Sequence, residues 1–597
     1  MSVLNVDDLS VAFRSEGRWL EVVHGLSFGI DAGETVAVVG ESGSGKSVTA
    51  LSVMRLLQKG VSRISGRVSL DGRELMALPD AEMRDVRGAD IGMIFQEPMT
   101  SLNPVLTAGF QVTEALRRHR AMDMAAARAE ALRLFDLVRI PDARRRLDEH
   151  PHTFSGGQRQ RVMIAMAMAC QPKLLIADEP TTALDVTIQA QILSLIAELQ
   201  KETGMAVMFI THDMGVVAEI ADRVVVMLHG RKVEEGTVHE VFARPREPYT
   251  KMLLASVPRL GSLGDTATPR RFAEIVDGVA DDAGGVDEPD KRGKPLLSVE
   301  GLVTRFAVRG GILGRPRGYV HAVEDVSFEV RAGETLALVG ESGCGKSTTG
   351  RSLLRLIEPV RGRVAFEDRD VMSASPAQMR DIRRRMQMIF QDPYGSLNPR
   401  KTVGAAIGEP IRVHGLATAD EAEARVVSLL ERVGLTADHA LRFPHEFSGG
   451  QRQRVCIARG LALDPTLIVA DESVSALDAS VKAQVVNLLL DLQRDLGLAY
   501  VFISHDIAVV ERVSHRVAVM LLGEIVEIGP RAAVLGDPHH PYTRKLISAV
   551  PIADPSERHG PRSLLTDEIR STIRPLGYEP EARRMIEVGA DHFVMEH

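Results

Sequence analysis

The chain has 597 residues, of which 45% are hydrophobic and 25% charged. This composition is typical of a globular protein with large cores, and the length favours two or more domains. The formal net charge of -8 argues against a nucleic-acid-binding protein, which usually has a basic excess, although a local basic patch stays compatible with it.

Cysteine usage and hydropathy indicate the cellular compartment in which the chain works. Cys170, Cys344 and Cys456 lie far apart, without the spacing of a zinc site or a disulfide framework. Free cysteines are typical of a reducing cytosol. No apolar run reaches the roughly 18 to 20 residues that a spanning helix needs, so any membrane part is expected from a partner.

The chain contains one set of motifs twice. Gly40-Glu-Ser-Gly-Ser-Gly-Lys-Ser47 returns as Gly340-Glu-Ser-Gly-Cys-Gly-Lys-Ser347, and Phe154-Ser-Gly-Gly-Gln-Arg-Gln-Arg161 returns unchanged from Phe447. Because the period is far longer than that of a solenoid repeat, a whole domain is duplicated. We expect domains at 1–258 and 296–554, a flexible acidic linker at 259–295, and a C-terminal tail at 555–597 to which the sequence assigns no role.

In each copy, short apolar runs alternate with helical segments. The runs expected as buried strands are Thr35–Val39, Leu174–Ala177, Val207–Ile210, Thr335–Val339, Leu467–Ala470 and Tyr500–Ile503. The clearest helices are Ile188–Glu202 and Val481–Leu496, and a helix-rich insert follows Phe95 and Phe390. This alternation predicts an α/β fold with a mainly parallel sheet.

The Gly-x-x-x-x-Gly-Lys-Ser motif follows a strand and precedes a helix, which is the context of a phosphate-binding P-loop. Its glycines allow backbone amides to turn toward phosphates, and the helix N-terminus adds its dipole. Lys46 is expected to reach the β- and γ-phosphates and Ser47 to bind Mg²⁺. The expected nucleotide-binding residues of the two loops are Gly40, Ser42, Gly43, Gly45, Lys46, Ser47, Val48, Gly340, Ser342, Gly343, Gly345, Lys346, Ser347 and Thr348.

Two apolar strands end in paired acids, Asp178-Glu179 and Asp471-Glu472. Side chains at the carboxyl end of a strand in an open α/β sheet emerge where ligands bind. Beside a P-loop, the aspartate is predicted to hold Mg²⁺, and the glutamate to orient or deprotonate the attacking water. A solvated turn would be the usual reading of such a pair alone.

Together these motifs resemble the ABC ATPases. Ser155-Gly156-Gly157-Gln158 and Ser448-Gly449-Gly450-Gln451 are similar to the signature of that family. Gln96 and Gln391 match the Q-loop, Ala183-Leu-Asp185 and Ala476-Leu-Asp478 the D-loop, and His212 and His505 the switch histidine. Phe13 and Phe306 are candidates for the ring that stacks on adenine, with core packing as the alternative.

The resemblance implies two tandem P-loop NTPase domains, each with a parallel sheet, an antiparallel β subdomain and a helical insert. It also implies a head-to-tail sandwich, in which Ser155 serves the nucleotide held by Lys346, and Ser448 the one held by Lys46. Catalysis is assigned to Glu179, Glu472, His212, His505, Gln96 and Gln391, and Mg²⁺ binding to Ser47, Gln96, Asp178, Ser347, Gln391 and Asp471. Since both copies keep these residues, we expect two hydrolytically competent sites.

Two-domain ABC proteins of this kind include importer ATPases, ribosome-bound translation factors and zinc-containing DNA-repair ATPases. Missing cysteine clusters argue against a zinc-containing repair ATPase, and a short Gly/Ala-rich linker against a ribosome-bound translation factor, which stays the alternative. Pro248-Tyr249-Thr250 and Pro541-Tyr542-Thr543 resemble the C-terminal element of oligopeptide, dipeptide and nickel importer ATPases. The chain looks like two such subunits fused, as in glutathione- and microcin-type importers.

The importer resemblance implies further expectations. The partners are two integral membrane permeases and, through them, an extracytoplasmic solute-binding protein, with no nucleic acid. The location is the cytoplasmic face of the cell membrane. No cysteine follows Thr250 before Pro295, so no iron–sulfur cluster is predicted. The residues expected to line the groove for the permease coupling helix, with core packing as the alternative, are Phe110, Val112, Leu116, Val403, Ile407 and Ile411. The choice of substrate in this family resides in the solute-binding protein and the permeases, so the sequence of the ATPase does not identify the substrate.

Overall fold

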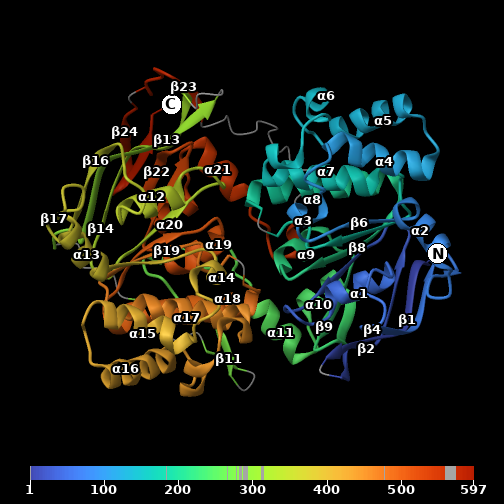
Figure 1. Ribbon diagram of the computed structural model, residues 1–597, viewed down its shortest axis with the longest axis horizontal. Helices are drawn as coiled ribbons and strands as arrows, with labels where there is room; N and C mark the ends of the chain where they lie inside the picture. The colour runs from blue at the N-terminus through green and yellow to red at the C-terminus, as the bar shows by residue number, and fades with distance from the viewer. Residues whose placement is uncertain are drawn as a thin grey trace.

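The two copies form two halves that lie side by side, the first blue to green and the second yellow to red in Figure 1. The computed structural model describes residues 2–15, 17–182, 184–264, 266–276, 279–281, 285–286, 293–310, 315–475, 477–558, 573–581 and 583–596. Each half has a mainly parallel sheet between helices and a separate antiparallel sheet, which confirms the predicted fold class.

The main sheet of the first half has the strand order β10-β9-β3-β8-β7-β6. Its strands are β3 (Thr35–Val39), β6 (Ile91–Ile94), β7 (Leu174–Asp178), β8 (Ala206–Thr211), β9 (Arg223–Leu228) and β10 (Arg231–Thr237). All pairs are parallel except β9 with β10. Every residue of β3, β7 and β8 is buried, as expected for apolar strands covered on both faces. One face packs on the antiparallel sheet together with α1 (Lys46–Val53) and α2 (Asp80–Ala89).

The helices of the first half pack against this sheet and form the insert. They are α1 (Lys46–Val53), α2 (Asp80–Ala89), α3 (Pro98–Ser101), α4 (Ala108–Arg120), α5 (Met124–Leu137), α6 (Ala143–Arg146), α7 (Gly156–Met168), α8 (Val186–Thr203), α9 (Met214–Ile220), α10 (Val238–Ala243) and α11 (Pro248–Ala255). Helices α3 to α6 form the predicted helix-rich insert, and α7 follows it with the signature motif at its N-terminus.

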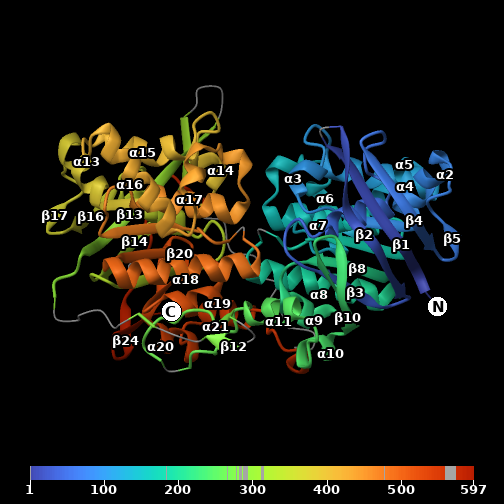
Figure 2. The same ribbon diagram turned by 90° about the horizontal axis from the view of Figure 1, so that it is seen from below.

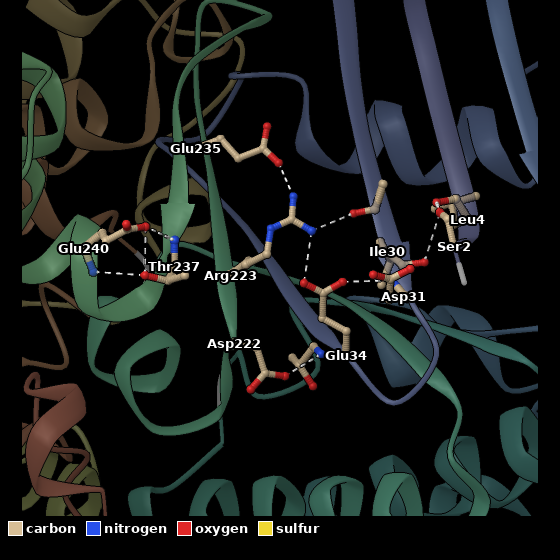
Figure 3. A network of polar contacts seen from close by, with 12 residues as sticks. Ser2, Leu4, Ile30, Asp31, Glu34, Asp222, Arg223, Glu235, Thr237 and Glu240 are labelled. Atoms are coloured by element: carbon tan, nitrogen blue, oxygen red, sulfur yellow. Dashed lines mark hydrogen bonds and ion pairs between the residues drawn. The ribbon is translucent and has the colours of Figure 1, made fainter.

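The antiparallel sheet of the first half has the order β2-β1-β4-β5. Its strands are β1 (Ser2–Ser15), β2 (Arg18–Asp31), β4 (Ser62–Leu70) and β5 (Arg73–Glu74). Figure 3 shows how Arg223, at the start of β9, fastens this sheet to the main one: it donates to the Gly29 carbonyl at 3.2 Å and to Glu34 at 3.0 Å, and it pairs with Glu235. Arg516 and Glu334 form the same ion pair in the second half, at 3.3 Å.

The second half repeats this arrangement. Its strands are β13 (Leu297–Gly310), β14 (Arg315–Val330), β15 (Thr335–Val339), β16 (Arg361–Phe366), β17 (Arg369–Asp370), β18 (Met386–Ile389), β19 (Leu467–Asp471), β20 (Ala499–Ile503), β21 (Arg516–Leu521) and β22 (Glu524–Pro530). Its helices are α12 (Lys346–Leu353), α13 (Pro376–Arg385), α14 (Pro393–Ser396), α15 (Val403–Val413), α16 (Ala419–Arg432), α17 (Gly449–Leu461), α18 (Ala479–Leu496), α19 (Ile507–Val513), α20 (Arg531–Gly536) and α21 (Pro541–Ser548).

The C-terminal tail adds strands to the second half only. β25 (His592–Met595) pairs with β22, β24 (Met585–Gly589) pairs with β25, and β23 (Ile573–Pro575) pairs with β14. His592 anchors the hairpin, since its Nε2 lies 2.8 Å from Oε1 of the buried Glu527. The main sheet of the second half therefore has two strands more than that of the first half.

The segment after α11, expected as a flexible acidic linker, contacts the second half over part of the residues that the structure describes. Glu511, on α19, accepts hydrogen bonds from the amides of Gly261 (2.9 Å) and Leu263 (3.1 Å). Phe272 is buried in the core of the second half, and its backbone exchanges two hydrogen bonds with the Asn487 side chain on α18. Strands β11 (Glu274–Val276) and β12 (Val279–Asp281) follow.

Candidate active sites

Each P-loop curls around its own lysine. Lys46 is the first residue of α1, directly after the loop that follows β3, and it is buried. Its Nζ donates to the carbonyl oxygens of Gly40 (2.7 Å) and Glu41 (2.9 Å). Lys346 makes the same two bonds, at 2.7 and 2.9 Å, in the second half. Val48 and Thr348 lie in the first turns of α1 and α12.

A serine and an aspartate meet beside each lysine. Ser47 Oγ donates to Asp178 Oδ1 at 2.9 Å, and Ser347 Oγ to Asp471 Oδ1 at 2.6 Å. Burial raises the pKa of Asp178 to about 6, with the charge of Glu179 adding to the effect and the Ser47 hydrogen bond opposing it. Oδ2 of Asp471 is buried without a hydrogen bond, and the Arg351 guanidinium lies 3.7 Å from it. A hydroxyl and a carboxylate fit the oxygen ligands that Mg²⁺ prefers.

The predicted catalytic side chains converge on one glutamate in each half. Gln96 Nε2 donates to Glu179 Oε2 at 2.9 Å, and His212 Nδ1 lies 3.2 Å from Glu179 Oε1. The second half repeats this cluster: the distances from Gln391 and His505 to Glu472 are 2.7 and 3.4 Å. In the first half these side chains come from three loops at the carboxyl ends of the neighbouring strands β6, β7 and β8.

The two glutamates combine a lowered pKa with a left-handed backbone conformation. Burial works against ionisation of Glu179, yet the hydrogen bond and charge of His212, with smaller effects of Thr182 and Lys46, lower its pKa to about 2. His505 likewise lowers the pKa of Glu472 despite burial. Both residues have φ in the left-handed region, 45° and 47°, a strain that concentrates at functional sites. An ionised carboxylate in a fixed position suits the orientation of a water molecule.

The signature motifs cap helices α7 and α17. Ser155 Oγ accepts from the amide of Gln158 at 3.3 Å, and the Gln158 side chain accepts from the Ser155 amide at 3.2 Å. A Cβ on Gly157 would lie 2.7 Å from Ile188, whereas one on Gly156 would meet nothing within 4 Å. The second glycine therefore serves helix packing, and the first leaves the helix N-terminus open to a ligand. Ser448 and Gln451 form the same box in the second half.

The D-loops connect the two halves. Asp185 Oδ1 accepts a hydrogen bond from the Ser342 amide at 2.5 Å, and Asp478 Oδ2 accepts from the Ser42 amide at 2.9 Å. Burial raises the pKa of Asp185, which Lys346 and His505 oppose. Each D-loop thus reaches the P-loop of the other half, as a head-to-tail pairing requires. Ala183 and Ala476 of the predicted motif lie outside the described residues.

Side chains predicted on the rim of the sites differ in exposure. Phe306 is 41% exposed on β13, whereas Phe13 packs partly buried against the core of the first half. Of the residues expected to line the insert groove, Phe110 is 42% exposed. The others are buried in the cores, so the alternative of core packing holds for Val112, Leu116, Val403, Ile407 and Ile411.

One pair of site residues could not be found from the sequence motifs. The hydroxyl oxygens of Tyr249 and Tyr542 accept hydrogen bonds from the P-loop amides of Glu41 and Glu341, at 2.9 and 3.0 Å. Both tyrosines belong to the Pro-Tyr-Thr elements, whose repetition marked them as a family feature. Nothing local in the sequence indicated that they contact the P-loop.

Comparison with protein-family models decides the family. The model described as ABC transporter matches residues 23–182 and again 323–475, which contain both P-loops, both signatures and both acidic strands. The chain belongs to the ABC transporter family. A second model, described as Oligopeptide/dipeptide transporter, C-terminal region, matches this ABC ATPase at residues 233–277 and 526–571. Both Pro-Tyr-Thr elements lie in these ranges.

Curated relatives match this ABC ATPase along its whole length. It is 56% identical over 608 residues to the Glutathione import ATP-binding protein GsiA of Pectobacterium atrosepticum, with 100% of this chain and 97% of that protein covered. The protein of the same name from Escherichia coli K12 is 56% identical over 607 residues, with the same coverage. A solved dimeric cassette with bound ADP and Pi is 30% identical, covers 39% of this chain and 98% of its own, and has a TM-score of 0.36.

Neither a metal cluster nor a membrane span is seen among the described residues. Among the described residues, no group of three or more histidine, cysteine, aspartate or glutamate side chains is arranged to hold a metal ion alone. Within the same residues, no helix has the length and hydropathy of a membrane span.

Proposed function

We propose that this ABC ATPase powers the import of glutathione or a related small peptide through two separate membrane permeases, supplied by an extracytoplasmic solute-binding protein. Full-length likeness to relatives named for glutathione import carries the proposal. The match of both C-terminal elements to the oligopeptide/dipeptide transporter region supports a peptide cargo. In this proposal the chain sits at the cytoplasmic face of the membrane, with 1–258 and 296–554 as its ATPase domains.

We propose further that the two ATP sites form between the halves. The phosphates held by Lys46 would face Ser448 at the N-terminus of α17, and those held by Lys346 would face Ser155 at the N-terminus of α7. The D-loop contacts to Ser42 and Ser342 support this pairing, because they already join each P-loop to the opposite half. Amides at a helix N-terminus are suited to a γ-phosphate.

Within each site, the residues would divide the work. Glu179 would hold the attacking water, and His212 would fix that carboxylate and contact the γ-phosphate. Gln96 would connect the site to the insert, where the permease is expected to bind. Mg²⁺, held by Ser47, Asp178 and Gln96 (Ser347, Asp471 and Gln391 in the second half), would neutralise developing charge on the phosphates. Phe306 is exposed enough to stack on adenine, and we propose the same role for Phe13.

In this proposal, bound ATP contacts both halves and holds them together. Binding energy is released only when both halves contact the nucleotide, so ATP favours the closed pair and its hydrolysis permits opening. Permeases bound to the two inserts would change conformation as the halves close and open. The twofold presence of every catalytic residue supports two working sites, in contrast to one working and one degenerate site.

The experiment that tests this function is mild affinity purification of the tagged chain from its own cells, followed by uptake of labelled glutathione in vesicles. Co-purification of two integral membrane proteins, with ATP-dependent uptake, is the expected result. Ribosomal proteins in stoichiometric amount, with no membrane protein, would instead assign the same ATP chemistry to translation. Permeases without glutathione uptake would keep the importer and overturn the cargo.

A further inference from the structure

The tyrosine of each Pro-Tyr-Thr element lies against the P-loop of its own half. The Tyr249 hydroxyl oxygen accepts from the backbone N–H of Glu41 at 2.9 Å, although the two residues are 208 positions apart. Tyr542 accepts from Glu341 at 3.0 Å. Such a long-range contact, made identically in both halves, indicates a role in the site.

The contact acts on the peptide unit that also holds the lysine. The N–H of Glu41 and the carbonyl of Gly40 belong to one planar peptide group. Tyr249 accepts from its N–H, and Lys46 Nζ donates to its oxygen at 2.7 Å. Since the group is rigid, fixing the N–H fixes the direction of the carbonyl. A hydrogen bond at one end also polarises the other and strengthens its bond.

This peptide group needs an external anchor because a glycine precedes it. Gly40 has a φ of +151°, and a Cβ there would lie 2.2 Å from the carbonyl oxygen of Met227. Only glycine fits at this position, yet glycine also makes rotation of the following peptide easy. Gly340 has the same conformation, with a φ of +148°.

We propose that Tyr249 and Tyr542 are positioning residues that set the P-loop lysines for phosphate binding. An ammonium group has three donors; Lys46 directs two at the carbonyls of Gly40 and Glu41, which leaves one for a nucleotide phosphate. With the Gly40 carbonyl fixed by Tyr249, that third donor has a fixed direction. The proposal rests on the ATP sites of the proposed function and deepens them.

Two further observations agree with this role. Burial raises the pKa of Tyr249 to about 12, so the phenol stays neutral and accepts from the amide without a competing charge. The helices that carry the tyrosines also pack on the long helix of the opposite half, α11 on α18 and α21 on α8, at the boundary seen in Figure 2. The position of each tyrosine is therefore set partly by the association of the halves.

The test measures ATP binding by the full chain in a Lys346→Ala background, in which the first site is the one probed. Tyr249→Phe removes the acceptor and keeps the ring, and we expect about three- to ten-fold weaker ATP binding, the effect of losing one hydrogen bond. In a chain that also carries Lys46→Ala, the same Tyr249→Phe change is expected to have no further effect. This non-additivity separates positioning of the lysine from a general loss of structure.

Tyr500→Phe is the matched control, because the buried Tyr500 hydroxyl donates to the Leu489 carbonyl at 3.1 Å, away from the P-loops. We expect it to leave ATP affinity unchanged. Normal affinity in Tyr249→Phe, or a loss that persists fully in the Lys46→Ala chain, would overturn the proposal. If Lys46→Ala alone left ATP binding unchanged, the proposed ATP site itself would fail, which is a distinguishable outcome.

Discussion

Asp478 accepts a hydrogen bond from the backbone amide of Ser42, 2.9 Å away in the P-loop of the other half. The residues at the two ends are 436 positions apart, so this bond exists only when the two halves are associated. Its counterpart joins Asp185 to Ser342. In both cases a carboxylate of one half holds an amide that borders the phosphate site of the other.

Removal of this carboxylate is predicted to weaken the first ATP site. Hydrogen bonds to charged groups contribute about 1.5–3 kcal/mol, so Asp478→Ala should raise the ATP concentration for half-maximal turnover by about ten- to 150-fold. The measurement is ATPase activity against ATP concentration. Asp495→Ala, at an exposed carboxylate near the end of α18, serves as the control and should match the parent. If the kinetics of Asp478→Ala matched those of the parent, the contact would make no contribution to ATP binding.

Lys482 is predicted to stabilise the second half through an ion pair between α18 and the start of α19. Its Nζ lies 2.8 Å from Asp506 Oδ2, both side chains are mostly buried, and the equivalent residue of the first half is Gln189. Lys482→Gln therefore copies the first half, and it should lower the melting temperature at pH 7 by roughly 3–8 °C. Thermal unfolding of the two chains side by side gives this difference directly.

The pH dependence of this difference follows from the two pKa shifts. Burial opposes the ionisation of Asp506, but the charge and hydrogen bond of Lys482 lower the pKa of Asp506 below that of a free aspartate. The contribution of the ion pair to stability is therefore lost only as the pH falls through this lowered pKa. Despite burial, Asp506 raises the pKa of Lys482, so the contribution is lost only as the pH rises through a value above that of a free lysine. The melting difference should stay constant from pH 5 to pH 9; a difference that halves between pH 7 and pH 5 would contradict this assignment.

Phe272 is predicted to hold the segment after α11 against the second half. Its ring is buried and lies under the guanidinium of Arg512, 5.2 Å from the ring centroid. Phe272→Ala removes this anchor, and we expect trypsin to cleave after Arg270 and Arg271 at least about ten-fold faster. Leu441→Ala, at a residue that is 79% exposed, is the control for a general loosening. An unchanged cleavage rate in Phe272→Ala would mean that other contacts hold the segment.

The central strands and the catalytic clusters were predictable because local patterns determine them. β3 and β15 begin and end where the apolar runs do, β7, β19 and β20 are longer than predicted by one residue at one end, and β8 is longer by one residue at each end. Strands buried on both faces leave a continuous apolar signal. Gln96, Glu179 and His212 follow separate strands of one parallel sheet, so the fold brings them together without further information.

The contacts that the sequence did not reveal depend on the tertiary structure. The role of Tyr249 requires a hydrogen bond between residues 208 positions apart. The tail strand β25 pairs with β22, and nothing in the sequence of β25 selects this strand as its partner. The docking of the segment after α11 rests on scattered buried side chains, Leu263, Phe272 and Val286, and on hydrogen bonds to Glu511 of α19. Single anchors of this kind leave no periodic pattern in a sequence.

The central claim, two working ATP sites in one importer subunit, is tested most directly by turnover of the chain with its permeases. Glu179→Gln and Glu472→Gln keep the size of each side chain and remove the charge that holds the water. We predict that each single substitution lowers ATP turnover and glutathione uptake to less than about a tenth. If one of them left turnover at the parental rate while the other abolished it, the two sites would not be equivalent, and the account would be contradicted.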